Sequence, residues 1–199
     1  MLQALNIHKS FEGKKILNDI SFSVSNASLN AIVGENGTGK STLLKIIVGE
    51  LKADKGLIIA NGSIGYCPQE ALLFSMLTVE ENFKYFACAY GLTKNDQWLE
   101  QRDYLLHSLK YSKYLKYRVD KLSGGTKQKL NLSIALLHDP PIFILDEPYG
   151  GFDWETYNHF YTMMADLRLK GKCVLLVTHM VTEAAPFNKI FTLREGKMT

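Results

Sequence analysis

The sequence predicts an α/β protein with a mostly parallel β-sheet, an antiparallel β segment at the N-terminus and an inserted helical segment. Three short, largely apolar runs, at residues 29–33, 142–145 and 173–177, lack the polar alternation of a half-exposed strand. Such runs are typical of parallel strands that are covered on both faces. Stretches of helical length alternate with the strands in the second half of the chain, which favours α/β layers.

Two further segments have the pattern of antiparallel strands. Residues 1–24 alternate weakly between apolar and polar around Gly13, which predicts two strands joined by a turn. Residues 55–62 end in Asn61-Gly62, a pair that favours a β-hairpin with the segment that follows. A last strand is expected at residues 191–195.

The inserted segment is helical in pattern. Between residues 79 and 117, aromatic and small side chains recur at intervals of three and four, which predicts amphipathic helices; the positions are Phe83, Phe86, Ala87 and Tyr90. Shorter helices are expected elsewhere, at residues 42–48, 125–137 and 154–169.

Length and composition indicate one folded domain over residues 1–199. Residues 1–69 and 122–199 carry the expected strands and the helices between them, and about 70–121 would form a helical subdomain. Hydrophobic residues make up 46% and charged residues 22%, a composition typical of a globular protein. The three cysteines are widely spaced and have no metal-ligand pattern, so free thiols are expected.

No nucleic-acid partner is expected. The net charge of +3 is too small to indicate one by itself. Residues 109–118 do interleave basic and aromatic side chains, which is also a pattern of nucleic-acid binding. A solvent-exposed helix face with partly packed tyrosines is the simpler interpretation.

The first glycine-rich stretch, residues 34–41, has the phosphate-binding pattern G-x-x-x-x-G-K-S. A strand, a glycine loop and a helix N-terminus direct backbone N–H groups and the positive end of the helix dipole at one point, which suits a polyphosphate. Lys40 would reach the β- and γ-phosphates, and the Ser41 hydroxyl would face Mg²⁺. A glycine-rich turn that binds nothing would require neither residue. The candidate residues are Gly34, Glu35, Asn36, Gly37, Thr38, Gly39, Lys40, Ser41 and Thr42.

Two more motifs lie downstream. In the second glycine-rich stretch, Ser123 can cap a helix, and Gly124 and Gly125 leave backbone N–H groups open to an anion. The strand at 142–145 ends in Asp146-Glu147, at the sheet edge where open α/β proteins bind ligands. Asp146 is a candidate for holding Mg²⁺ through water, and Glu147 for orienting and deprotonating the attacking water.

These motifs, in this order, resemble the ATP-binding subunit of ABC (ATP-binding cassette) transporters from Phe11 to His179. The resemblance implies a P-loop NTPase core and an ATPase that takes ATP and Mg²⁺. It also gives roles to isolated residues: Phe11 would stack on adenine, Gln69 would contact Mg²⁺, and His179 would contact the γ-phosphate. The implied catalytic residues are Lys40, Glu147 and His179; the implied metal contacts are Ser41, Gln69 and Asp146; the implied nucleotide contacts outside the P-loop are Phe11, Ser123, Gly124, Gly125 and Asp153.

Two positions depart from the family pattern. Thr126 stands where the family favours glutamine, and Tyr149 stands where threonine is more usual. Apart from the resemblance, Gln69 would be read as a surface residue, His179 as structural and Phe11 as part of a strand's core.

The resemblance also implies partners. Two subunits would pack head to tail, so that Ser123-Gly124-Gly125 of one covers the ATP of the other; both homodimers and heterodimers fit. The apolar runs are far shorter than the ~20 residues of a spanning helix, and residues 2–7 are too short for a signal peptide. The pore is therefore expected in a separate permease, which would hold the chain at the cytoplasmic face of the cell membrane. Residues 77–83 and 90–92 most resemble exporter-type subunits.

Two alternatives belong to other functional classes. A non-transport ABC ATPase that acts on ribosomes or chromosomes usually has two cassettes or a long coiled coil, and neither occurs in this sequence. A regulatory subunit that holds ATP without cleaving it would not need Glu147 and His179.

Overall fold

The computed structural model describes residues 1–179 and 187–199, which divide into two compact units. The first unit comprises Met1–Tyr66, Pro140–Asp146 and Met164–Thr199. The second comprises Cys67–Asp139 and Glu147–Met163. The second unit contains the expected helical segment and extends beyond it. That residues 70–121 form a subdomain of their own stays a prediction.

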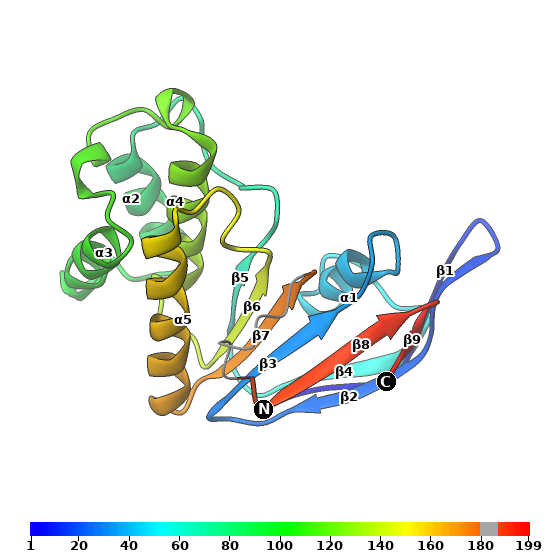
Figure 1. The fold of residues 1–199 in the computed structure, drawn as a ribbon. Coiled ribbons are helices and arrows are strands. Elements are labelled where there is room, and N and C mark those ends of the chain that lie inside the picture. Colours follow the sequence, from blue (N-terminus) through cyan, green and yellow to red (C-terminus); the bar gives the residue numbers. More distant parts are fainter. Residues whose placement is uncertain (180–186) are drawn as a thin grey trace. The chain divides into compact units, whose positions relative to one another are not determined.

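A mostly parallel sheet with strand order β5-β6-β7-β3-β8-β9 forms in the described residues (Figure 1). Strand β7 pairs in parallel with β3 and β6, β3 pairs in parallel with β8, and β8 pairs antiparallel with β9. The bounds are Ser28–Val33 (β3), Ile64–Cys67 (β5), Ile142–Asp146 (β6), Cys173–Thr178 (β7), Lys189–Arg194 (β8) and Lys197–Met198 (β9). Every residue of β6 and β7 is buried, as expected for the middle of a covered parallel sheet, which confirms the predicted fold class.

The register of the parallel strands brings their carboxyl ends to one edge. In β3, Val33 lies opposite Thr178 of β7, and in β6, Asp146 lies opposite Val177. The loop that follows β3, the last residue of β6 and the residue after β7 therefore meet at the same edge of the sheet.

The N-terminal antiparallel sheet has the strand order β2-β1-β4, with β1 at Leu2–Phe11, β2 at Lys14–Val24 and β4 at Lys55–Ala60. The β1–β2 hairpin agrees with the sequence prediction. The hairpin predicted at Asn61-Gly62 is wrong, because β4 pairs with β1 and β5 joins the parallel sheet. Gly62 instead packs against the Pro141 ring, where a Cβ would lie 2.5 Å from the ring. Pairing of β4 with the distant strand β1 thus prevailed over the local hairpin that the turn residues favour.

Helices dominate the second unit: α2 (Val79–Ala89), α3 (Gln97–Ser108), α4 (Gly124–Leu136) and the first part of α5 (Trp154–Leu169). In the first unit, α1 spans Lys40–Ile47. The helical pattern predicted over 79–117 is interrupted after α2, where Gly91 adopts a φ of 72°. In the part of the chain that the structure describes, no helix has both the length and the apolar character needed to cross a bilayer.

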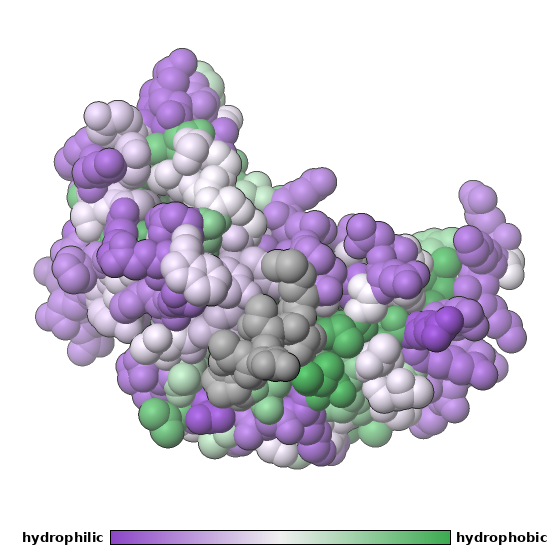
Figure 2. All heavy atoms as spheres, in the orientation of Figure 1, coloured by the Kyte–Doolittle hydropathy of each residue, from purple (hydrophilic) through white to green (hydrophobic). Residues whose placement is uncertain are grey.

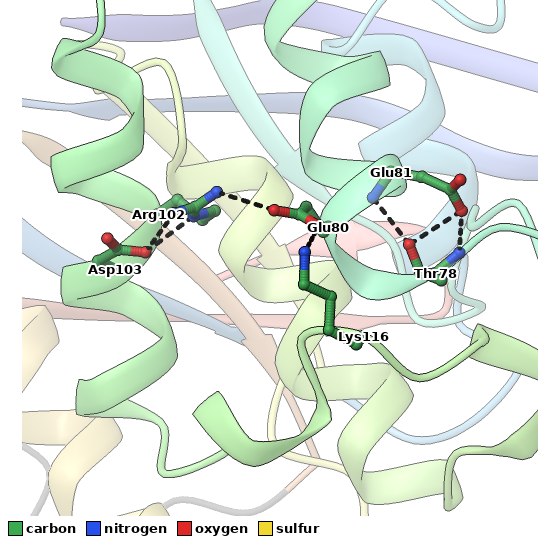
Figure 3. A network of polar contacts seen from close by, with 6 residues as sticks. All are labelled: Thr78, Glu80, Glu81, Arg102, Asp103 and Lys116. Atoms are coloured by element: carbon green, nitrogen blue, oxygen red, sulfur yellow. Dashed lines mark hydrogen bonds and ion pairs between the residues drawn. The ribbon is translucent and has the colours of Figure 1, made fainter.

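The start of α2 is fixed by a polar network (Figure 3). Thr78 and Glu81 form a reciprocal capping box: the Glu81 carboxylate accepts the Thr78 N–H at 2.7 Å, and the Thr78 hydroxyl accepts the Glu81 N–H at 3.2 Å. Glu80 accepts a hydrogen bond from Lys116 and lies 3.8 Å from Arg102 of α3. Glu80 thus links α2 to α3 and to the segment before α4.

The start of α4 makes a close backbone contact. A Cβ on Gly125 would lie 2.2 Å from the carbonyl oxygen of Gly151. Glycine is therefore required at position 125 because a neighbouring backbone occupies the space of any side chain. Gly124 has nothing within 4 Å of an added Cβ, so packing does not require glycine there.

We predict that Gly125→Ala destabilises the fold by ~1–3 kcal/mol, because the added methyl group displaces the backbone at Gly151. Gly124→Ala is the matched control, and it should unfold at the wild-type urea midpoint or slightly above it, because alanine restricts the unfolded chain and no neighbour occupies the space of its methyl group. Equal midpoints for Gly125→Ala and the wild type would contradict the close contact.

Candidate functional site

The loop after β3 has a backbone that only glycine adopts easily. Gly37 and Gly39 have φ angles of 81° and 105°, in the left-handed region. A Cβ on Gly34 would lie 2.4 Å from the carbonyl oxygen of Leu193 in β8. The glycines predicted from the P-loop pattern are therefore required by backbone conformation and by close packing.

Lys40, the first residue of α1, directly follows this loop. The Lys40 Nζ donates to the carbonyl oxygens of Gly34 and Glu35, at 2.6 and 2.8 Å, and the residue is 8% exposed. An ammonium group has three N–H donors, so one remains for a ligand. The N-cap residue, Gly39, gives α1 no side-chain cap, and the first N–H groups of a helix have no partner within it. This arrangement suits a polyphosphate anion.

Three other candidates belong to the same sheet edge. Asp146 ends β6 and is buried, His179 directly follows β7, and Ser41 is exposed in the first turn of α1. The strand register brings these residues and the P-loop to the carboxyl edge of the parallel sheet in the first unit. This is the edge at which open α/β sheets bind ligands.

Phe11 is the last residue of β1, and 46% of its surface is exposed. Because it is exposed at the end of the strand, Phe11 does not belong to the core of the N-terminal sheet. Its one described ring contact is with Lys9, whose Nζ lies 5.3 Å from the ring centroid.

In the second unit, Glu147 and Gln69 lie together. The Gln69 amide nitrogen donates to the Glu147 carboxylate at 3.3 Å. The amide oxygen of Gln69 takes no part in this hydrogen bond. Glu147 has a φ of 45°, a conformation uncommon outside glycine and found at functional sites. Both residues line a cavity of about 330 Å³, whose other walls are Gly124, Gly125, Gln128, Gly150 and Gly151.

Ser123 caps α4 as the sequence predicts. Its hydroxyl accepts the Thr126 N–H at 3.2 Å and contacts the Thr126 hydroxyl at 2.9 Å. Thr126, which departs from the family pattern, is therefore part of the cap. The exposed Gly124 begins the helix, and its backbone N–H has no intrahelical acceptor.

The Asp153 carboxylate is engaged inside its own unit. It accepts the N–H and the hydroxyl of Thr156, at 2.8 and 3.0 Å, and so fixes the first turn of α5. These hydrogen bonds, with a smaller contribution from the Lys129 charge, hold the pKa of Asp153 below its usual range.

Sequence reasoning missed three polar residues of α4. Lys129 donates to Thr156 at 2.9 Å, with its Nζ 3.6 Å from Asp153. Asn131 donates to the carbonyl oxygen of Pro68 at 2.8 Å and so holds the segment before Gln69, and Gln128 lines the cavity at Glu147. All three are buried, in a helix that is buried along most of its length. The sequence does hold a signal of this burial. Polar and apolar residues of α4 do not separate into two faces, as they would in a helix with one side in solvent.

Known proteins resemble this chain over most of its length. Residues 17–150 match the family model described as "ABC transporter". An uncharacterized ABC transporter ATP-binding protein of Methanocaldococcus jannaschii is 33% identical over 96% of this chain and 73% of its own length. The linearmycin resistance ATP-binding protein LnrL of Bacillus subtilis is 33% identical over all of this chain and 68% of its own length.

A solved structure, described as the ATP-binding subunit of an ABC transporter, is 28% identical and superposes with a TM-score of 0.92 over 99% of this chain and 87% of that chain. The chain spans only 28% and 29% of two longer relatives from Dictyostelium discoideum. The family match covers more than half of the chain, and the site has the P-loop of an ATP-binding domain. The chain therefore belongs to the ABC transporter family and is an ATP-binding cassette of that family.

Proposed function

We propose that this cassette hydrolyses ATP with Mg²⁺, in sites shared with a second cassette, and thereby drives a separate membrane permease. The observation that carries the proposal is the geometry at Lys40, where a glycine loop and an uncapped helix start surround an ammonium group that retains a free donor. An anion-binding loop of this kind, at the same sheet edge as a buried aspartate, supports nucleotide binding.

The residues of the first unit would bind the nucleotide. Backbone N–H groups of residues 34–42 and the Lys40 ammonium contact the phosphates, Phe11 stacks on adenine, and His179 contacts the γ-phosphate. Ser41 and Asp146 of the first unit would hold Mg²⁺, and the family resemblance alone adds Gln69 as a further Mg²⁺ contact. A hydroxyl, a carboxylate and an amide oxygen are the hard oxygen donors that Mg²⁺ prefers, so the set fits the ion. When bound, Mg²⁺ neutralises part of the phosphate charge.

Glu147 would act as general base. Gln69 donates to its carboxylate, which supports an orienting role for Gln69. A base must stand within hydrogen-bonding reach of the water that it deprotonates, and the cavity at Glu147 has room for such a water.

A second cassette would give the amino end of α4 a function. The exposed amino end of α4, at Ser123, Gly124 and Gly125, is a second anion-binding element with no evident use for the same nucleotide. We propose that it covers the ATP of a second cassette, which is another copy of this chain or a homologue. Asp153 would contribute by fixing the loop that faces that partner.

The permease would dock on the second unit. An aromatic patch of Phe74, Tyr85, Phe86 and Tyr90 connects ring to ring, from 4.3 Å between the centroids of Phe74 and Tyr85 to 6.1 Å between Phe86 and Tyr90. Phe83 lies in the core instead, while Phe74, Tyr85 and Tyr90 are exposed. Exposed, connected aromatic side chains are common at partner sites.

Docking there would place the chain at the cytoplasmic face of the membrane. An exporter-type role is our further proposal. It is supported by the pattern at residues 77–83 and 90–92 and by the name of the linearmycin resistance relative.

We predict that Glu147→Gln keeps ATP binding and slows hydrolysis by ~10²-fold or more, because an amide cannot accept the proton of the attacking water. Phosphate release measures the rate, and calorimetry measures binding. The matched control is Glu100→Gln on the exposed side of α3, which should hydrolyse like the wild type. Hydrolysis by Glu147→Gln at the wild-type rate would exclude Glu147 as the base.

Mixing two inactive variants tests the shared site. Lys40→Ala removes one half of a composite site, and Ser123→Arg blocks the other half. If the chain pairs with itself and the sites act independently, an equal mixture should recover up to about a quarter of the wild-type rate, because half of the randomly formed dimers hold one intact site. Specific activity of the wild type that stays constant on dilution into the monomer range would contradict sharing.

The aromatic patch is tested with a pair of tyrosines. Tyr85→Asp places a charge in the patch, and Tyr104→Asp places one on α3 at similar exposure, 46% against 50%. Both isolated variants should hydrolyse ATP like the wild type. Tyr85→Asp should lose co-purification with a membrane protein from the source cells, whereas Tyr104→Asp keeps it. If Tyr85→Asp still co-purifies, the permease docks elsewhere.

A further inference from the structure

The end of β1 is tied to Asp54, the residue that precedes β4. The Asp54 backbone N–H donates to the His8 carbonyl oxygen at 2.9 Å. Its carboxylate accepts the Ser10 N–H at 2.7 Å and the Lys9 Nζ at 2.9 Å. Asp54 therefore contacts three consecutive residues just before Phe11.

This contact extends the sheet beyond its last paired residues. The ladder between β1 and β4 ends where His8 lies opposite Lys55. Beyond that point, the Asp54 carboxylate takes the place of a backbone carbonyl and binds the N–H of Ser10. Phe11 then leads into a turn with left-handed residues, Glu12 at φ 48° and Gly13 at φ 80°. The tip of this hairpin is hydrophilic in Figure 2 and carries exposed lysines.

Lys9 links the clamp to the Phe11 ring. Its Nζ, held by Asp54, lies 5.3 Å from the ring centroid, within range of a cation–π interaction. The Lys9 side chain is only 13% exposed, so the stem is packed while the ring beside it stays exposed. Among the described residues, no other ring or cation contacts the Phe11 ring. The Lys9 ammonium thus supports the ring, while 46% of the surface of Phe11 remains exposed.

We propose that Asp54 and Lys9 are positioning residues for Phe11, which they hold in place to stack on the base of the bound nucleotide. The inference rests on the proposed function, in which Phe11 meets the adenine. Holding the ring before binding lowers the ordering cost that the nucleotide would otherwise meet. The hydrogen bonds from Lys9 and Ser10 also hold the pKa of Asp54 below its usual range, so the carboxylate stays ionised at neutral pH.

The test compares a nucleotide with its phosphate chain alone. ATP and inorganic tripolyphosphate, each with Mg²⁺, are titrated into the wild type, Asp54→Asn and Asp19→Asn. Asp19 is the matched control, because its carboxylate also accepts a hydrogen bond within the same sheet, from the Asn6 amide. Its φ of 62° is a conformation that asparagine adopts readily. Asp54→Asn should weaken ATP binding by ~3- to 10-fold and leave tripolyphosphate binding unchanged. Asp19→Asn should change neither.

Further variants separate positioning from a structural role. Asp54→Asn should raise KM for ATP without lowering kcat, and Asp54→Glu should restore part of the loss. In a Phe11→Ala background, Asp54→Asn should have no further effect on ATP binding, because the ring through which it acts is gone. If Asp54→Asn folds poorly by circular dichroism, Lys9→Met tests the same point, because it keeps the packed stem and removes the charge.

The inference is overturned if ATP affinity is the same in Asp54→Asn and the wild type, or if ATP and tripolyphosphate weaken equally. Failure of the wild type to bind ATP would instead overturn the proposed function, so the two failures are distinct.

Discussion

The parallel pairing of β7 with β3 and β6 is the constraint on which the site in the first unit depends. These strands are buried almost throughout, so their backbone groups must pair with one another. Parallel pairing with this register makes all three strands end at one edge. The chain must leave the sheet there each time, and the residues at those exits are the P-loop, Asp146 and His179. A site at this edge is therefore a consequence of the strand pairing.

In the second unit, the comparable constraint is the contact between two stretches of backbone. Gly125 and Gly151 approach too closely for any side chain between them. Lys129 reinforces the contact because it reaches Thr156 and Asp153 from the same helix. The amino end of α4 and the loop before α5 are thus held as one element.

Features fixed by local chemistry could be predicted from the sequence. The P-loop, the cap at Ser123 and the buried strands depend on residue types within a few positions. The failed hairpin at Asn61-Gly62 shows the limit. The turn was favourable, but the residues of β1 that pair with β4 lie 47 to 58 positions earlier in the chain. The contacts of Lys129 and Asp54 likewise join residues 27 and 44 or 45 positions apart, which no local pattern reveals.

The candidate functional residues of the two units fall into two kinds, and the difference bears on their roles. Asp153, Lys129 and Asn131 use their polar atoms on neighbours within their own unit, so they set the shape of the loops. Ser41, Gly124 and Phe11 are exposed instead, so a ligand can reach them. Lys40 combines both properties, since two of its donors hold the P-loop closed and the third is available. Binding of a phosphate at Lys40 therefore adds to the loop's own hydrogen bonds, which is how a preorganised site gains affinity.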